Sequence, residues 1–439
     1  MASRTASNRQ PLPVLIEHLK TRNFPSPFYL YDGDGARAAL QDLVQLLKDR
    51  LKGFRAHVYL PVFANPCLPL LDLLVASADR VGVLVNTVPE LAAVQSYSWQ
   101  LPPQIAFAGG ILSAGEVKRV CHGANLFYAA SISNFETALE CDARPVADLG
   151  LRIDLSETGE LRGVPIRELK EYFSKHADRA QKVSAIHAYQ GPNVPSFDAC
   201  LAHADALLSL VDLFPALTQV NFSGGWPFDY SETDAPLPST RPSFLNYLAE
   251  LEKLIRQFCK RKSIVEMAFE PGKFLLAAYG FFFCSVVESR PTGTHQTDVH
   301  LDSSFVHLPS LKLKDRQHAV ALFDSAWQRR ATGRMFCRLR GCTGLSTDFL
   351  MPRLVVLPAV PKPGDHIVIH DLGVYGWAGS YNFLGLQRPA EYVMCDGQIH
   401  LVREQQGENH LLEGLRPLHA SGDDITSVAQ PETPTAAAL

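Results

Sequence analysis

The feature that most constrains the fold is a regular alternation of short apolar runs with helix-length segments. Most neighbouring runs are separated by segments that carry apolar residues at i, i+3 and i+4, which is the pattern of amphipathic helices. Strands that alternate with helices build parallel sheets, and eight such units favour an α/β fold of the (β/α)8 barrel type. The predicted strands are residues 56–62, 80–86, 104–109, 125–130, 149–155, 183–189, 218–224 and 263–272.

The chain is longer than one barrel. It has 439 residues, whereas a single hydrophobic core stops growing at roughly 250–300 residues. After about residue 285 the pattern changes to strands and turns, for example "RLVVLPAV" (353–360) and "DHIVIHD" (365–371). We therefore expect a barrel over 35–285 and a β-rich domain over 286–420. The polar, proline-containing end at 421–439 is expected to be disordered.

Composition and charge exclude several classes of protein. A net charge of −4 and the lack of a long basic stripe argue against a nucleic-acid surface. No apolar stretch reaches the length of a membrane span, and the first 20 residues lack the apolar core of a secretory signal. The nine cysteines show no CxxC spacing, which indicates reduced thiols. We expect a cytoplasmic protein without nucleic-acid or membrane partners.

Chemistry in such barrels lies at the carboxyl ends of the strands. The seventh predicted strand ends in "SGG" (223–225), whose open backbone amides suit a phosphate, although a tight turn is the simpler alternative. The eighth ends in "EPGK" (270–273) after an apolar stretch. A buried carboxylate at Glu270 requires a cation, a protonated heterocycle or a structural hydrogen bond to a neighbouring loop.

Three ordered motifs, together with the whole span from 26 to 403, resemble one enzyme family. They are "VNFSGGWPFDY" (220–230), "EPGK" (270–273), and "PGDHIVIHDLGVYGWAGSYNF" (363–383) with "RPAEYVM" (388–394). They are similar to the alanine-racemase-like (fold type III) decarboxylases, which act on diaminopimelate, ornithine or carboxynorspermidine and use pyridoxal phosphate. This resemblance implies a barrel followed by a β-domain that also takes in the N-terminal segment 1–34.

The resemblance also implies roles for individual residues. Gly224, Gly225 and Tyr375 match groups that hold the cofactor phosphate. Glu270 matches the carboxylate that keeps the pyridine nitrogen protonated, and Tyr189 falls where the family stacks a histidine on the ring. The cofactor-binding candidates are Gly224, Gly225, Glu270, Gly272, Tyr189 and Tyr375. The catalytic candidates are His187, for which packing inside the barrel is the alternative, and Asp348.

Four positions depart from the family pattern. Phe63 in "PVFANP" replaces the Schiff-base lysine, and Gly344 stands at the catalytic cysteine position, with Cys342 two residues earlier. Leu308 replaces an arginine that grips the substrate carboxylate. Lys273 replaces an arginine, so that a point charge stands in for a bidentate fork. Lys273 and Phe63 are the substrate-binding candidates.

The loss of the lysine leaves three hypotheses. The first is a divergent decarboxylase-like enzyme of a biosynthetic pathway that acts on an amino acid or its derivative. The second is an inactive homologue that regulates or stabilises an active paralogue, because the family works as a dimer whose site is completed by a partner loop, here 341–348. The third is lysine-independent chemistry at a metal. His366 and His370 lie too far apart along one strand to share an ion, so no metal site is predicted.

Retention of the pocket groups favours the first hypothesis. A purely structural subunit has no need of Glu270 as an acceptor for a pyridine nitrogen. Phe63 offers no amine, and Lys52, Lys312 and Lys314 are poorly placed to replace one. Pyridoxal phosphate, if it binds, is therefore expected to bind non-covalently, in a homodimer or in a heterodimer with a paralogue.

Overall fold

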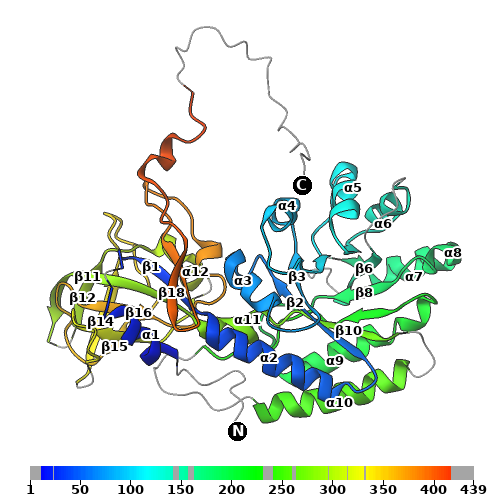
Figure 1. Cartoon of the computed structure of the whole chain (residues 1–439), viewed down its shortest axis with the longest axis horizontal. Helices are drawn as coiled ribbons and strands as arrows, with labels where there is room; N and C mark the ends of the chain where they lie inside the picture. The colour runs from blue at the N-terminus through cyan, green and yellow to red at the C-terminus, as the bar shows by residue number, and fades with distance from the viewer. Residues whose placement is uncertain are drawn as a thin grey trace.

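The computed structural model contains two sheets, one closed into a barrel and one forming a β-rich domain beside it (Figure 1). The expected tail at 421–439 lies outside the described residues. The structure describes residues 11–22, 24–141, 148–156, 163–230, 241–259, 264–294, 296–313, 315–330 and 333–416.

The barrel closes through eight parallel strands, which confirms the predicted fold class. Each predicted apolar run overlaps one of these strands. They are buried on both faces, which is why they appear as continuous apolar runs. A short extra strand, β7 (Val164–Pro165), pairs with β6 outside the ring and was not predicted. The barrel strands are β2 (Arg55–Pro61), β3 (Val81–Val85), β4 (Ile105–Phe107), β5 (Leu126–Ala129), β6 (Asp148–Asp154), β8 (Ala185–Ala188), β9 (Gln219–Asn221) and β10 (Glu266–Phe269).

Helices follow the barrel strands and cover the ring from outside (Figure 1). Two of them begin with a capping box, at Thr87 with Glu90 and at Ser113 with Glu116, which satisfies amides at the first turn. The helices are α2 (Gly33–Arg50), α3 (Leu68–Val75), α4 (Val88–Ser96), α5 (Ala114–Gly123), α6 (Ile132–Leu139), α7 (Ile166–Lys175), α8 (Ala177–Ala180), α9 (Phe197–Leu208) and α10 (Arg241–Cys259).

The β-rich domain uses both ends of the described chain. Its first strand, β1 (Phe28–Asp32), pairs antiparallel with β11 and parallel with β17. Helix α1 (Pro11–Leu19) packs its apolar face on the same sheet, against Phe28 and Phe281. The remaining strands are β11 (Gly280–Gly293), β12 (Gln296–Leu301), β13 (Val320–Phe323), β14 (Met335–Arg340), β15 (Val355–Leu357), β16 (His366–Ile369), β17 (Ala390–Cys395) and β18 (Gln398–Arg403).

Three hydrogen bonds fasten the loop after β2 to the β-rich domain. The Tyr375 amide donates to the Ala64 carbonyl at 2.7 Å, and the Asn65 side chain donates to the Gly373 carbonyl at 2.8 Å. Arg403 donates to the Pro66 carbonyl at 3.1 Å. These bonds place Tyr375 at the mouth of the barrel. Among the described helices, none combines the length and apolar character that a membrane crossing requires.

Candidate active site

A pocket lies at the carboxyl ends of β2, β8, β9 and β10, with Tyr375 contributed by the β-rich domain. Helix α11 (Gly272–Leu276) begins at its edge, directly after Glu270 and Pro271. All six residues predicted to bind a cofactor and both predicted to bind substrate line this pocket. They are Phe63, Tyr189, Gly224, Gly225, Glu270, Gly272, Lys273 and Tyr375.

The "SGG" turn has the geometry of an anion cradle. Ser223 and Gly225 have positive φ angles of 60° and 81°, and a Cβ atom at Gly224 would collide with the Glu270 carbonyl oxygen. The Gly224 carbonyl accepts from Gln190, and the Gly225 carbonyl accepts from the Val194 amide at 2.8 Å. Within the described part of the chain, the Gly224 and Gly225 amides donate to no protein acceptor. Two such amides beside a pocket suit a phosphate.

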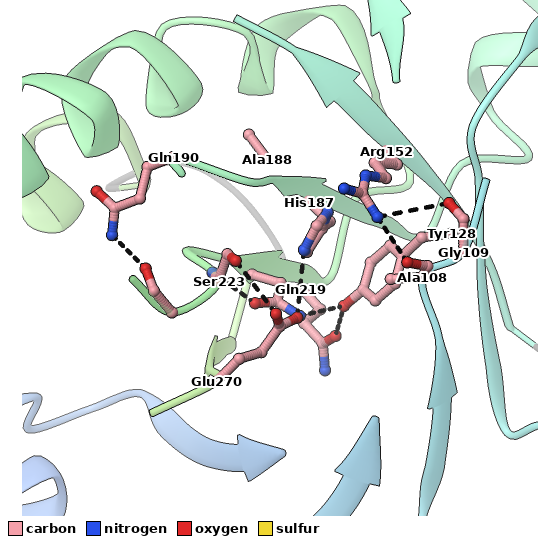
Figure 2. A network of polar contacts seen from close by, with 12 residues as sticks. Ala108, Gly109, Tyr128, Arg152, His187, Ala188, Gln190, Gln219, Ser223 and Glu270 are labelled. Atoms are coloured by element: carbon pink, nitrogen blue, oxygen red, sulfur yellow. Dashed lines mark hydrogen bonds and ion pairs between the residues drawn. The ribbon is translucent and has the colours of Figure 1, made fainter. Parts of the chain in front are cut away.

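Glu270 lines the pocket, is only 7% exposed and takes part in the network of polar contacts drawn in Figure 2. Its carboxylate accepts from the Asn221 side chain at 2.9 Å and from the Ser223 hydroxyl at 3.1 Å. The His187 Nε2 atom lies 3.2 Å from Oε1, within ion-pair range but outside hydrogen-bond geometry.

Burial alone would raise the pKa of Glu270. The neighbouring His187 imidazole, the Asn221 hydrogen bond and the charge of Arg152 outweigh burial and lower the pKa below its ordinary value of 4.5. The carboxylate is therefore ionised at neutral pH and can accept a hydrogen bond from a protonated heterocycle.

A chain of side chains inside the barrel fixes Asn221 beneath Glu270. The Asn221 amide group donates to the Tyr128 hydroxyl at 3.2 Å, and that hydroxyl donates to Gln219 at 2.7 Å. Gln219 in turn donates to Glu266 at 3.2 Å, near the opposite end of the barrel. This series of hydrogen-bonded side chains was not predicted from the sequence. Its signal was a set of polar residues inside apolar strands, such as Asn221 in "TQVNFSG".

Arg152 is a second residue that sequence analysis missed. Its guanidinium donates to the Ala108 carbonyl at 2.6 Å (Figure 2). It also lies 5.8 Å from the centre of the Tyr189 ring. Burial raises the pKa of Tyr189, while the Arg152 charge opposes that rise. Arg152 thus supports the ring that faces the pocket. An arginine within the apolar strand "LGLRIDL" was the available signal.

Phe63, Lys273 and Tyr375 form the part of the lining nearest the β-rich domain. Phe63 is partly buried against two apolar clusters. Lys273 is 8% exposed, and its Nζ atom lies 5.4 Å from the Tyr375 ring centre. Burial raises the pKa of the Tyr375 hydroxyl well above its ordinary range, with smaller contributions from Tyr189 and Tyr230. Tyr375 is therefore a neutral hydrogen-bonding group.

The two catalytic candidates do not line the described pocket. His187 lies buried behind Glu270, against the Tyr128 ring. Asp348 organises the loop from Gly341 onward: it accepts from Ser304 and the Phe305 amide at 3.0 Å each and from the Thr343 hydroxyl at 2.7 Å. Within its own subunit, Asp348 holds the loop 341–348 in place. A catalytic role for Asp348 at the site of a second subunit stays a prediction.

The closed barrel and the β-rich domain match the architecture of solved decarboxylase structures. The chain's relatives and structure neighbours include diaminopimelate and lysine/ornithine decarboxylases, which are of fold type III, so the resemblance inferred from the motifs is confirmed. No protein-family model matches the chain.

Among the relatives is Protein TabA of Pseudomonas amygdali pv. tabaci, which is 23% identical over 411 residues, covering 91% of this chain and 92% of TabA. A probable chloroplastic diaminopimelate decarboxylase of Oryza sativa subsp. japonica is 29% identical over 403 residues, which cover 86% of this chain and 77% of the rice protein. The structure of the diaminopimelate decarboxylase of M. jannaschii in complex with L-lysine superposes with a TM-score of 0.76 at 18% identity. The superposition covers 92% of this chain and 95% of the M. jannaschii chain.

Proposed function

We propose that the chain is a decarboxylase-like enzyme that acts on an amino acid or an amino-acid derivative and holds pyridoxal phosphate in the described pocket. Homologous decarboxylases of amino-acid biosynthesis use this cofactor. The observation that carries the proposal is the pairing of two amides, at Gly224 and Gly225, that bond no acceptor among the described residues, with an ionised buried carboxylate at Glu270 in one pocket. These groups match a phosphate and a pyridinium nitrogen.

Each residue has a distinct task in this proposal. The Gly224 and Gly225 amides take the phosphate, because each offers a hydrogen-bond donor to an anion. Glu270 keeps the ring nitrogen protonated. Tyr189 presents an aromatic face to the ring, supported by Arg152. When bound, the cofactor supplies an electron sink for a carbanion formed on the substrate.

Phe63 and Leu308 shape what the pocket accepts. Leu308 is fully buried, so the family's carboxylate-binding arginine has no substitute at that position. Phe63 gives the pocket an apolar surface where the family has an amine. We infer a substrate with an amino-acid head group whose remaining part contacts Phe63.

The test compares pyridoxal phosphate with pyridoxal, which lacks the phosphate. We expect the wild type to bind the phosphorylated form at least tenfold more tightly, measured by equilibrium dialysis. Glu270→Gln should weaken binding of both forms, because it removes the negative charge beside the ring nitrogen.

Glu250→Gln is the matched control, since Glu250 is exposed and bonds only Lys253 in the described structure. Failure of the wild type to bind either form would overturn the proposal and favour the inactive homologue that works with a paralogue.

A further inference from the structure

We propose that Lys273 forms a covalent bond, an imine, with the aldehyde of a ligand bound in this pocket. The inference rests on the proposed function, because it takes the aldehyde to be that of pyridoxal phosphate. It replaces the expectation of purely non-covalent binding, which considered Lys52, Lys312 and Lys314 as sources of an amine but treated Lys273 only as a charge.

The topology places Lys273 beside the position that has lost its amine. Strands β2 and β10 are neighbours in the barrel, with Phe269 in register with Val58. The segments that follow them carry Phe63 and Lys273. The backbone between is close-packed, since a Cβ atom at Gly272 would lie 3.0 Å from the Pro61 ring. The Lys273 amine therefore enters the pocket from the end of β10, one strand away from the Phe63 position after β2, where the family has its lysine.

The side chain of Lys273 points into the pocket rather than to solvent. It is 8% exposed and lines the same pocket as Phe63, Glu270 and the "SGG" turn. Lys273 contributes the one primary amine among the described lining residues. Lys52, in contrast, precedes β2 and so lies at the amino end of that strand, away from the pocket.

The covalent step balances without a further reactant. The neutral Nζ amine attacks the aldehyde carbon, a C–N bond forms, and the carbonyl oxygen leaves as water, which yields a C=N bond. Water or an incoming substrate amine reverses the step by attack on the same carbon. Borohydride delivers hydride to the C=N bond and leaves a stable secondary amine, so the bond can be trapped.

The alternative role for Lys273 is an ionic contact with the phosphate alone. Lys273→Arg separates the two roles, because arginine keeps the positive charge but does not form this imine. Lys253→Arg is the matched control: Lys253 is an exposed lysine bonded to Glu250. The full-length protein is mixed with pyridoxal phosphate, reduced with borohydride and mapped by peptide mass spectrometry.

We expect wild type and Lys253→Arg to carry the adduct at Lys273, and Lys273→Arg to lose at least nine-tenths of it while still binding pyridoxal phosphate in dialysis. Phe63→Lys combined with Lys273→Arg should carry the adduct at residue 63, which shows that the arginine variant keeps a competent pocket. An adduct at another lysine, or dialysis-proven binding with no adduct, overturns the Lys273 proposal alone. Absence of binding in dialysis overturns the proposed function as well.

Discussion

Gly225 shows how one backbone angle sets the chemistry of the pocket. Its φ of 81° lies in a region that favours glycine, and a Cβ atom would collide with the Gly191 carbonyl oxygen. We expect Gly225→Ala to lower the free energy of unfolding by about 1–3 kcal/mol and to weaken phosphate binding, because the amide turns away from the cradle. Chemical denaturation and titration with inorganic phosphate measure the two effects.

The matched control is Gly115→Ala, since the position is helical and a Cβ atom there meets open space. Equal losses at Gly115 and Gly225 would contradict a local role for the turn.

Glu270 makes stability depend on pH in a defined direction. Its folded-state pKa lies below the ordinary value of 4.5, so its ionised form contributes stability above pH 4.5. That contribution is lost as the pH falls through the lower folded-state value. We expect the free energy of unfolding of wild type to fall more steeply below pH 4.5 than that of Glu270→Gln, measured by urea denaturation across this range. Parallel pH curves for the two proteins would contradict the assignment.

The pocket residues could be predicted because they follow strand ends and match family motifs. Glu270, Gly224, Gly225 and Tyr375 were found in this way, and all of them line one pocket. Arg152, Asn221 and Tyr128 could not, since a polar residue within an apolar strand does not reveal which partner it meets across the barrel. His187 was a candidate for catalysis, but its position behind Glu270 depends on two strands that only the fold brings together.

The loop after β2 depends on its bonds to the β-rich domain. Asn65 is 2% exposed, donates to the Gly373 carbonyl and accepts from the Cys67 amide at 2.9 Å. We expect Asn65→Ala to lower the free energy of unfolding by about 2–3 kcal/mol, because two buried backbone groups lose their partner. It should also weaken pyridoxal phosphate binding by displacing Tyr375.

Gln45→Ala provides the comparison, since within the described part of the chain the Gln45 side chain bonds only the exposed Asp49. Denaturation curves for Asn65→Ala that match those of Gln45→Ala would exclude a fastening role for Asn65.

The predicted elements differ in how well sequence revealed them. The barrel strands were found because each is a largely buried apolar run, and all neighbours except β2 and β10 follow one another along the chain. Periodicity did not predict that strand β1 joins the second sheet. The residues that pair with β1, at 280–283 and 390–394, lie far from it in the sequence. Strands β13 and β14 were also not predicted. Strand β13 has only four residues, and β14 mixes arginines with apolar residues.

The loop over 341–348 is the basis for a prediction that the protein associates with itself. Asp348 holds this loop, while Leu345 remains 38% exposed although it is apolar. Homologous decarboxylases are typically dimers. We expect twice the monomer mass in analytical ultracentrifugation at micromolar concentration, and at least tenfold weaker association for Leu345→Glu.

Val14→Glu is the control, because Val14 is an exposed apolar residue on α1, in another part of the chain. A wild type that sediments as a monomer, or equal weakening by both variants, would contradict this assignment of the interface.

The pairing of β1 with β17 has a consequence for the order of events during synthesis on the ribosome. Strands β2 to β10 are contiguous in the chain, so the nascent barrel can close early. The β-rich sheet must wait for residues 390–394 to emerge before β1 gains its parallel neighbour. A nascent chain therefore carries Gly224, Gly225 and Glu270 in place before Tyr375 is docked, and the pocket becomes complete only late in synthesis.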